Sequence, residues 1–402
     1  MRVLYLTHHL PWPSYSGGRL REAELLRRMA SGSFDIELVA VSKTVHEDLL
    51  FVSSASELGI DAHVFAAHPH WTPWNGPLVS RHDSAMARIY LSEVAQRNDV
   101  DVVHVEGHYL LSLLPAKLRQ RAVLVEHNVE SNLLAQQLRA CTSPRRLIEL
   151  RRSWALTRWD EIRAWRAANS IVTVTEADKT AIEARLPDAS VCVVPNGYDH
   201  LDKSRQRRPQ GAPGFDRADL VMVGNYAYQP SEDAALRLLT SVFPLILRQR
   251  PATTLALVGN QPSARMHDAA ADPRVTITGR VTDVGEWLTA ASVFVCPLRV
   301  GGGIKVKIVE ALAHGRVVVT TPIGAQGLES ANREALVVRE DDAAIAAECV
   351  NLLQHPDQLR RRSAKARQSV ASMSTWDEAA DMLASRWLGS VPGRNWIETR
   401  VV

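Results

Sequence analysis

The stretch SVFVCPLRVGGGIKVKIVEALAHGRVVVTT, residues 292–321, joins two short apolar runs through a glycine-rich loop and one helical segment. The runs at 292–297 and 316–321 lack polar alternation, which is typical of strands buried on both faces of a parallel sheet. Two parallel strands need a crossover connection, usually a helix, and the segment between the runs supplies one. The stretch therefore predicts a βαβ unit whose glycine loop follows its first strand.

Similar apolar runs recur along both halves of the chain and alternate with helical segments. The runs are 2–7, 35–41, 63–66, 101–105, 122–127 and 170–175 in the first half, and 219–224, 254–259, 274–279, 292–297, 316–321 and 335–338 in the second. This alternation predicts an α/β fold made of two doubly wound, Rossmann-like sheets. The length of 402 residues agrees, since one domain commonly has about 100–200 residues.

A linker and a closing helix complete the predicted organisation. Segment 202–217, DKSRQRRPQGAPGFDR, is polar, basic and rich in proline and glycine, as linkers commonly are. The helical spacing of Trp376, Ala380, Leu383 and Trp387 predicts a helix after the second half. We expect a Rossmann-like domain over 1–205, a linker over 206–217, a second Rossmann-like domain over 218–374, and a C-terminal helix and tail over 375–402 that packs back on the first domain.

Composition and charge limit the classes of function. The formal net charge is only +3, so nothing in the chain as a whole calls for nucleic acid as a partner. The four cysteines show no CxxC pair and no Cys/His spacing, which predicts neither a disulfide framework nor a zinc site. No apolar run approaches the ~20 residues of a membrane span, and the first residues do not resemble a signal peptide. We expect a cytoplasmic protein.

The glycine-rich loop has the features of a phosphate site. Backbone amides at the start of a helix, aided by the helix dipole, bind phosphate oxygens, and Gly301, Gly302 and Gly303 precede such a start. Lys305 and Lys307 add positive charge suited to a diphosphate. The alternative interpretation is an ordinary glycine turn followed by a solvated basic turn.

The whole block 297–328 resembles the donor-binding motif of the family 4 retaining glycosyltransferases of GT-B fold, in a subgroup with a glycine-rich, lysine-bearing loop. Further segments fit the pattern of this family in the same order: PWPSYSGGRLRE (11–22), VEHNVES (125–131), TVTEADK (173–179), VVPNGYD (193–199), VGNYAYQPSEDAALRLL (223–239) and VGN (258–260). The resemblance spans nearly the entire chain. It implies an acceptor-binding and a donor-binding Rossmann-like domain that face each other across a cleft.

The resemblance also implies roles for individual residues. His127 in EHNVE matches the histidine that faces the donor sugar, and Glu310 matches a glutamate of the donor motif, so these are the candidate catalytic residues. The implied donor-binding residues are Gly17, Gly18, Gly224, Asn225, Val281, Gly301, Gly302, Gly303, Ile304, Lys305, Lys307 and Arg299. A surface ion pair is an equally good interpretation of Arg299, and a lone histidine is more often structural than functional.

The sequence departs from the family pattern at two places. The family commonly has a first glutamate where this chain has Gly302, and that glutamate contacts hydroxyl groups of the donor sugar. The family also often has an arginine just after the glycine at 224 and a lysine one turn later, where this chain has Asn225 and a serine that we take as Ser231. Lys305, Lys307 or a nearby arginine must then meet the phosphate charge.

The resemblance implies transfer of a sugar from a nucleotide-diphosphate donor to a hydroxyl group, with retention of anomeric configuration. The acceptor is a small molecule or a saccharide. The nucleotide sugar is a co-substrate, no cofactor is expected, and no DxD-like carboxylate pair calls for a metal ion. A nucleotide-sugar epimerase and a non-catalytic nucleotide-sugar-binding paralogue are the alternatives.

Two tryptophan-bearing segments are candidates for other contacts. Trp71 and Trp74 in the loop 68–82 are weak acceptor-site candidates, and a core under the loop is the slightly favoured alternative. The basic segment 144–166 predicts a helix with a solvated arginine face and buried tryptophans. Contact of this helix with an anionic membrane is the less favoured interpretation.

Overall fold

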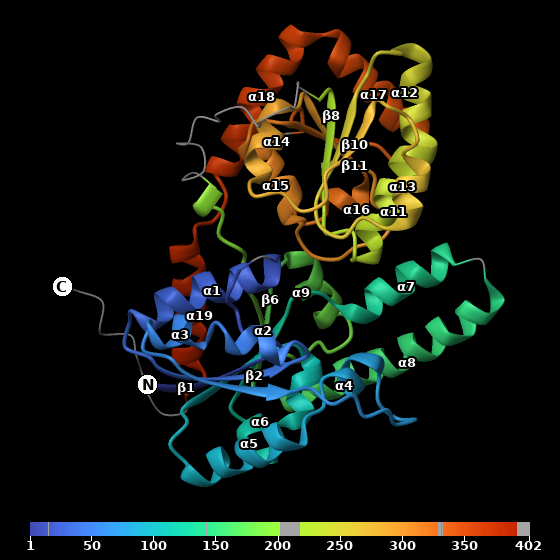
Figure 1. The fold of residues 1–402 in the computed structure, drawn as a ribbon. Helices are drawn as coiled ribbons and strands as arrows, with labels where there is room; N and C mark the ends of the chain where they lie inside the picture. Colours follow the sequence, from blue (N-terminus) through green and yellow to red (C-terminus); the bar gives the residue numbers. More distant parts are fainter. Residues whose placement is uncertain (15, 142, 202–217, 329–330, 332, 392–402) are drawn as a thin grey trace. The chain divides into compact units, whose positions relative to one another are not determined.

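The structure is a computed structural model that describes residues 1–14, 16–141, 143–201, 218–328, 331 and 333–391 (Figure 1). The chain divides into two compact units, which are described one at a time. The first consists of Met1–Gly197 and Ser374–Val402, and the second of Tyr198–Met373. The predicted linker over 206–217 lies outside the described residues.

The first unit contains a parallel seven-stranded sheet in the order β3-β2-β1-β4-β5-β6-β7. Its strands are β1 (Arg2–Thr7), β2 (Asp35–Ser42), β3 (Asp61–Ala66), β4 (Val102–Glu106), β5 (Ala122–Glu126), β6 (Ser170–Thr173) and β7 (Val191–Val193). All six predicted runs of this half are strands. Successive residues of β1 are buried in different core clusters, Leu4 and Leu6 in one and Val3 and Tyr5 in the other, as expected for a sheet covered on both faces.

Helices cover both faces of this sheet. They are α1 (Gly17–Ala30), α2 (Val45–Leu49), α3 (Val52–Ser56), α4 (Pro77–Arg81), α5 (Ala85–Arg97), the 3₁₀ helix η1 (His108–Leu113), α6 (Ala116–Arg119), α7 (Glu130–Ala140), α8 (Pro144–Ala167), α9 (Glu176–Glu183) and α19 (Trp376–Gly389). The first turn of α1 has an N-cap at Ser16, whose hydroxyl accepts a hydrogen bond from the Arg19 amide.

The C-terminal helix α19 belongs to the first unit, and Figure 1 shows it in red against the blue α1. Trp376, Leu383 and Trp387 are buried in the core on this face of the sheet. Thr375 and Glu378 form a capping box at the helix start. Gly197 lies so close to this start that a Cβ there would be 2.1 Å from the Trp376 amide nitrogen, so only glycine fits.

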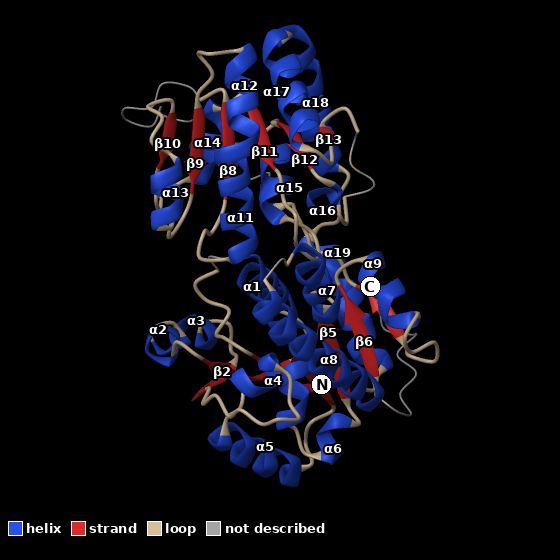
Figure 2. Cartoon of the chain, turned by 90° about the vertical axis from the view of Figure 1, so that its right-hand side faces the viewer, coloured by secondary structure: helices blue, strands red, loops and turns tan. Residues whose placement is uncertain are grey.

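The second unit contains a parallel six-stranded sheet in the order β10-β9-β8-β11-β12-β13, which Figure 2 shows side by side. Its strands are β8 (Leu220–Val223), β9 (Leu255–Val258), β10 (Val275–Ile277), β11 (Val293–Cys296), β12 (Val317–Thr320) and β13 (Leu336–Val338). All six predicted runs of this half are strands. The buried apolar residues of this unit form one continuous hydrophobic core, which includes the completely buried central strands.

Helices also cover both faces of the second sheet (Figure 1). They are α11 (Gln229–Arg237), the π-helical turn η2 (Leu238–Val242), α12 (Phe243–Gln249), α13 (Ala264–Ala269), α14 (Val284–Ala290), α15 (Val306–Ala313), α16 (Pro322–Ala325), α17 (Asp342–Gln354) and α18 (Pro356–Ala371). Within the described ranges, no helix of either unit has the length and apolar character needed to cross a bilayer.

Each sheet reverses its strand order at one place. In the first unit the reversal lies between β1 and β4, and in the second it lies between β8 and β11. Ligands of open α/β sheets bind beyond the carboxyl ends of the strands at such a point. The loops after these four strands are therefore the places where each unit is expected to bind a ligand.

Candidate active site

The glycine loop follows β11, at the reversal point of the second sheet. The Nζ atom of Lys305 donates hydrogen bonds to the carbonyl oxygens of Gly302 and Gly303 at 3.0 and 2.6 Å. Lys305 is only 9% exposed, and Gly303 has a positive φ of 56° that favours glycine. Lys305 thus fixes the shape of the loop, which the sequence did not predict. The loop ends at α15, whose N-cap is Lys305 itself.

Lys307 connects the start of α15 to α11, the helix that follows β8. It lies in the first turn of α15, and its Nζ donates to the hydroxyl of Ser231 at 3.1 Å. Ser231 is buried in the first turn of α11, the helix after β8. The position where the family commonly has a lysine is thus a serine in contact with the ammonium group of Lys307.

The loops after β8 and β9 approach each other through two glycines. A Cβ on Gly259 would lie 1.7 Å from the carbonyl oxygen of Gly224, and the Gly259 φ of 146° is open to glycine alone. The Gly224 amide donates to the Val258 carbonyl at 3.0 Å. Next to it, the side-chain oxygen of Asn225 accepts from the Ala227 amide at 3.2 Å. These contacts hold the backbone after β8 in one fixed shape.

The remaining donor-site candidates of this unit lie around α15. Glu310 is half-buried, and burial together with the charge of Asp283 raises its pKa to about 7. Val281 and Ile304 are half-buried and pack against the core of the unit. Arg299 forms an exposed ion pair with Asp233 at 3.3 Å, which agrees with the surface interpretation of that residue.

The first unit has a buried hydrogen-bond network at its own reversal point. His127, just after β5, has its Nε2 2.7 Å from Oε2 of Glu106 at the end of β4. Glu106 is fully buried, whereas the His127 side chain is 26% exposed. Burial alone would lower the pKa of His127, but attraction and hydrogen bonding to Glu106 raise it. His127 also holds the pKa of Glu106 well below its usual range, although burial opposes ionisation.

Glu106 is held from three sides, and the network reaches the C-terminal helix. Its Oε1 accepts from the Tyr5 hydroxyl at 2.7 Å and lies 2.9 Å from Nε2 of His104. The indole N–H of Trp387 in α19 lies 3.1 Å from Nδ1 of His104. Because an indole N–H only donates, Nδ1 of His104 accepts this hydrogen bond. The Nε2 atom of His104 therefore carries the hydrogen and donates a hydrogen bond to Glu106. Glu106 therefore orients His127 within a fixed frame.

Further histidines and a glutamate surround this network. Two groups of three side chains in the described part of the chain have possible metal-ligand atoms within 4.8 Å of one another: His8, His9 and Glu22, and Glu22, Glu106 and His127. The Glu22 carboxylate is fully buried, and Nε2 of His9 lies 2.8 Å from its Oε1. Hydrogen bonds satisfy the Glu106 carboxylate, whereas both carboxylate oxygens of Glu22 and Nε2 of His9 have no hydrogen-bond partner in the described part of the chain.

The loop between β1 and α1 contains the other glycine pair of the prediction. Gly17 is the first residue of α1, and a Cβ added to Gly18 would meet nothing within 4 Å. The neighbouring Arg21 is buried and donates to the carbonyls of Val194 and Pro195 at 2.8 and 2.9 Å. Arg21 thus ties the start of α1 to the loop VPNG. Contacts within the described residues do not explain why position 18 is glycine.

A second buried pair of ionisable side chains, His108 and Glu126, lies at the end of β5. Nδ1 of His108 is 3.2 Å from the Glu126 carboxylate, whose other neighbour is the Trp165 indole N–H at 2.9 Å. Burial opposes protonation of His108, but Glu126 raises its pKa to about 9. Burial raises the pKa of Glu130, the first residue of α7, to about 7. Glu130 therefore lies within electrostatic range of the buried His108–Glu126 pair.

The two tryptophan-bearing segments differ from the favoured expectation. Trp71 and Trp74 are 60% and 75% exposed, so they do not fill a core under their loop. In α8, Trp165 is buried as predicted, but Trp159 is 51% exposed. The reason is that the buried side of α8 is occupied by Leu150, Thr157, Asp160, Glu161, Ala164 and Trp165, which leaves Trp159 on the opposite side.

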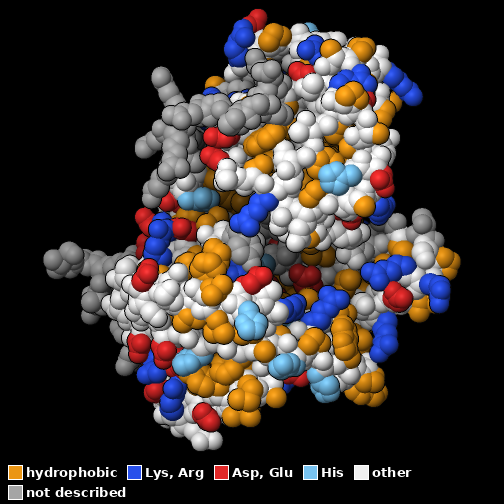
Figure 3. All heavy atoms as spheres, viewed as in Figure 1, with side chains coloured by type: hydrophobic (Ala, Val, Ile, Leu, Met, Phe, Trp, Pro, Cys, Tyr) orange, Lys and Arg blue, Asp and Glu red, His pale blue; other side chains and the backbone are white. Residues whose placement is uncertain are grey.

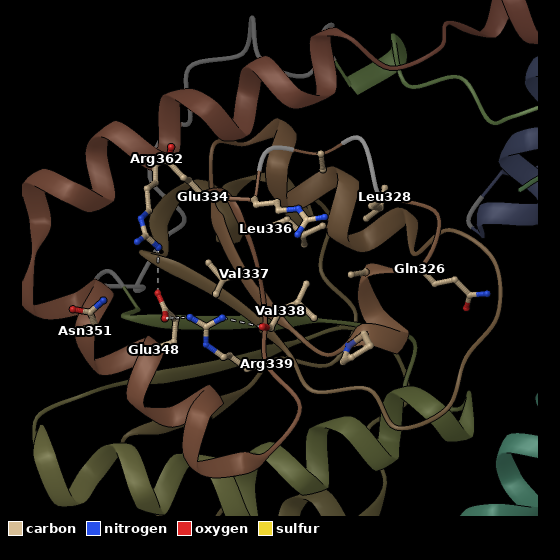
Figure 4. Close-up of a pocket in the computed structure, with 14 residues that line it drawn as sticks. Gln326, Leu328, Glu334, Leu336, Val337, Val338, Arg339, Glu348, Asn351 and Arg362 are labelled. Atoms are coloured by element: carbon tan, nitrogen blue, oxygen red, sulfur yellow. Dashed lines mark hydrogen bonds and ion pairs between the residues drawn. The ribbon is translucent and has the colours of Figure 1, made fainter. Parts of the chain in front are cut away.

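One pocket of the second unit lies away from the glycine loop, between α16, β13, α17 and α18 (Figure 4). It has a volume of about 600 Å³. Its charged side chains pair with one another: Glu348 binds Arg339 at 2.8 Å and Arg362 at 3.2 Å. Two of its three lining arginines are therefore engaged by Glu348, and the third is Arg333.

Several residues of the site were not predicted. His104 and Glu106 lie in β4, His8 and His9 follow β1, and Glu22 lies in α1. The available signal was positional, because the polar residues in THHL and HVEGH come at the ends of apolar runs. Their mutual contacts depend on the strand order, which the sequence does not state.

Comparison with known proteins identifies the family. Residues 23–200 match the sequence profile described as Glycosyltransferase Family 4, and residues 217–355 match the one described as Glycosyl transferases group 1. An uncharacterized 44.6 kDa protein in the cps region of Klebsiella pneumoniae is 20% identical over 366 residues, which cover 87% of this chain and 90% of that protein. Glycogen synthase of Mycobacterium tuberculosis is 28% identical over 223 residues, 53% of this chain and 52% of that enzyme.

A solved structure has the same fold. The crystal structure of Anabaena HepE in complex with UDP and glucose matches with a TM-score of 0.64 at 17% identity, over 96% of this chain and 99% of that one. The match confirms the predicted GT-B fold. Because two glycosyltransferase profiles together cover most of the sequence, the chain belongs to the family 4 (group 1) glycosyltransferases.

Proposed function

We propose that this glycosyltransferase takes a hexosyl or related sugar from a nucleotide-diphosphate donor and transfers it to a hydroxyl group of a small-molecule or saccharide acceptor. The observation that best supports a nucleotide sugar is the glycine loop after β11, held by Lys305 and followed by Lys307 beside α11. Backbone amides and a lysine at a reversal point suit the negative charge of a leaving diphosphate. The binding of UDP and glucose by HepE supports the same class of donor.

His127 is proposed to orient the sugar. Its Nε2 is engaged by Glu106, and its Nδ1 has no hydrogen-bond partner within the described part of the chain. A protonated ring donates from Nδ1 to a sugar hydroxyl, and its charge is balanced by Glu106 rather than by the substrate. A role as general base does not follow, because Glu106 favours the protonated form.

Glu310 is proposed to accept hydrogen bonds from the ribose hydroxyls. The position of its half-buried carboxyl group, on the helix that begins at the glycine loop, supports this role. Gly302 leaves the position of the first family glutamate without a side chain, so hydroxyl groups of the donor sugar must be bound by other residues. Assays with a panel of nucleotide-sugar donors will therefore identify the sugar.

Retention and independence from metal ions belong to the proposal. Positive charge from Lys307 and the amides after β11 takes the role that a divalent cation has in metal-dependent transferases. Retention is carried over from the family resemblance, with front-face attack and a donor phosphate oxygen that assists deprotonation of the acceptor. A cytoplasmic location, where nucleotide sugars are made, is part of the same proposal.

Nucleotide release from UDP-, GDP-, dTDP- and ADP-sugars tests the proposal, with a mixture of saccharide and lipid-extract acceptors present. We expect release from one donor, equal with and without EDTA, and a product whose anomeric proton coupling matches that of the donor. A strict requirement for a divalent ion would overturn the metal-independent form of the reaction. Binding of a nucleotide diphosphate without release from any donor would identify a non-catalytic relative instead.

A further inference from the structure

A row of exposed residues runs along α8. Positions 148, 152, 155, 159, 163 and 166 are exposed and follow one another at intervals of three or four residues, which places them on one face of the helix. This face contains Ile148, 70% exposed, and Trp159, 51% exposed. The opposite face packs into the first unit through Leu150, Thr157 and Trp165. The helix is thus anchored on one side and open along the other.

The loop with the two exposed tryptophans is attached to the same helix. The Gly76 amide donates to the Asp160 carboxylate of α8 at 2.6 Å, and a Cβ on Gly76 would lie 3.2 Å from the Thr157 backbone. Trp74 is therefore two residues from Gly76, which has a fixed contact with α8. The partner in that contact, Asp160, follows Trp159 in the sequence. Within the described ranges, the tryptophans exposed to solvent are Trp71, Trp74 and Trp159. Trp159 lies on the exposed face of α8, and Trp71 and Trp74 lie on the loop that is bound to the buried Asp160 and Thr157 of this helix.

Arginines surround these apolar side chains. Those on α8 that are exposed are Arg145, Arg146, Arg151, Arg152, Arg163 and Arg166. Glu149 is the exposed acid of the helix, whereas Asp160 and Glu161 are buried. The Arg163 guanidinium lies over the Trp159 ring at 4.6 Å, and that of Arg81 over Trp71 at 5.9 Å. Figure 3 shows basic side chains (Lys and Arg, blue) and hydrophobic side chains (orange) together on the right-hand flank, where Figure 1 places α8.

We propose that this surface, here named the interfacial patch (Ile148, Arg151, Arg152, Trp159, Arg163 and Arg166 on the exposed face of α8), docks on an anionic lipid bilayer. Large apolar side chains in a row of cations are typical of helices that lie in the bilayer interface, where the rings enter the headgroup region and the guanidinium groups bind phosphates. The net charge of the chain is only +3, so the positive charge of the patch is a local feature.

The patch fits lipid better than nucleic acid. Single-stranded nucleic acids stack bases on open aromatic faces. The Arg163 guanidinium lies over one face of the Trp159 ring, so that face is not open to a base. A lipid headgroup layer instead binds a helix face that carries both apolar rings and cations, because the rings can enter more deeply while the cations stay near the headgroups. Docking would bring the enzyme to the place where lipid-linked acceptors occur, although the proposal does not depend on the acceptor.

Vesicle flotation tests the proposal with the full chain. The vesicles are phosphatidylcholine alone or an equal mixture with phosphatidylglycerol, at low and at moderate salt. The patch variants are the double change Arg151→Ser with Arg152→Ser, and Trp159→Ser. The matched controls are Arg360→Ser with Arg361→Ser on α18, another exposed arginine pair, and Leu50→Ser, an apolar residue that is 75% exposed. Thermal unfolding and nucleotide-diphosphate binding check that each variant folds.

We expect wild type to float with the anionic vesicles only, and more at low salt. Since each arginine near an anionic surface changes the affinity roughly fivefold, the double arginine variant should bind about 25-fold more weakly. Trp159→Ser should weaken binding about tenfold, and both controls should behave as wild type. Equal flotation of the arginine variant and its control, or failure of wild type to float, would refute the lipid assignment. Tighter binding to single-stranded RNA, lost in the same variants, would assign the patch to nucleic acid instead.

Discussion

The reversal points of the two sheets have the same topology but different chemistry. In the first unit, buried ionisable side chains gather there, with Glu106 at the centre and His127 at the exposed end. In the second unit, the same position is formed by glycines, backbone groups and the lysines at 305 and 307. The difference suits a division of labour. The second unit offers fixed dipoles and cations for a diphosphate, and the first offers a group whose protonation is set by its surroundings.

The largest expected effect comes from removing the ionisable group. His127→Ala should lower kcat about 100-fold or more, because an oriented, charged donor contributes on this scale, and should leave nucleotide-diphosphate binding nearly unchanged. Initial-rate kinetics and calorimetric binding measure the two quantities. His267→Ala, an exposed histidine of α13, is the matched control. Equal activity of the two variants would remove His127 from the reaction.

The complementary change removes the ammonium group of Lys307 in the second unit. Lys307→Met should weaken binding of the nucleotide diphosphate about 10- to 100-fold, because a charge-assisted hydrogen bond in a half-buried site contributes roughly 1.5–3 kcal/mol. Lys365→Met, at a surface lysine paired with Glu334, should bind normally. If Lys307→Met binds as tightly as this control, the diphosphate does not lie at the glycine loop.

A third change separates the orientation of His127 from its presence. Glu106 raises the pKa of His127 against the effect of burial, so Glu106→Gln should lower that pKa and move the alkaline limb of the kcat profile to lower pH. A shift of one pKa unit corresponds to about tenfold lower activity at a pH above the limb. The pH profile and the NMR titration of the imidazole measure it. A lower rate at every pH with an unmoved limb would indicate a merely structural Glu106.

The smallest expected effect concerns Glu310 and has a defined sign. Its pKa is about 7 in the free protein, so below that pH the carboxyl group carries a proton. Since the ribose hydroxyls need a carboxylate, nucleotide affinity should rise as the pH increases through about 7 and then level off, with a change of about fivefold. In Glu310→Gln this component should vanish, and only titration of the nucleotide phosphates should remain. An identical pH dependence in both proteins would rule out the ribose contact.

The sequence predicted the sheets well for a physical reason. Strands buried on both faces of a parallel sheet are continuous apolar runs, so all twelve predicted runs are strands. The short edge strand β7 is only half-buried and carries a weaker signal. The predicted glycine loop also lies at a reversal point, because a loop after a buried strand must reach the carboxyl edge of the sheet.

The contacts of the site could not be predicted in the same way. Glu106 and Tyr5 are 101 residues apart, and Trp387 and His104 are 283 apart, so their hydrogen bonds depend on the strand order and on the return of α19. Lys305 was expected to bind phosphate from its charge and position, but whether its ammonium group turns back to the loop carbonyls depends on the loop backbone. The exposure of Trp159 depends on which side of α8 the rest of the unit covers.

The division of labour is tested most directly by measuring UDP binding and nucleotide release together for wild type, His127→Ala and Lys307→Met, with the donor that the panel identifies and its own nucleotide if that is not UDP. We predict that His127→Ala binds the nucleotide like wild type but releases it from the donor about 100-fold more slowly. Lys307→Met should bind the nucleotide weakly and stay slower than wild type even at high donor concentration, because Lys307 also stabilises the charge of the leaving diphosphate. Loss of binding in His127→Ala, with normal binding in Lys307→Met, would contradict it.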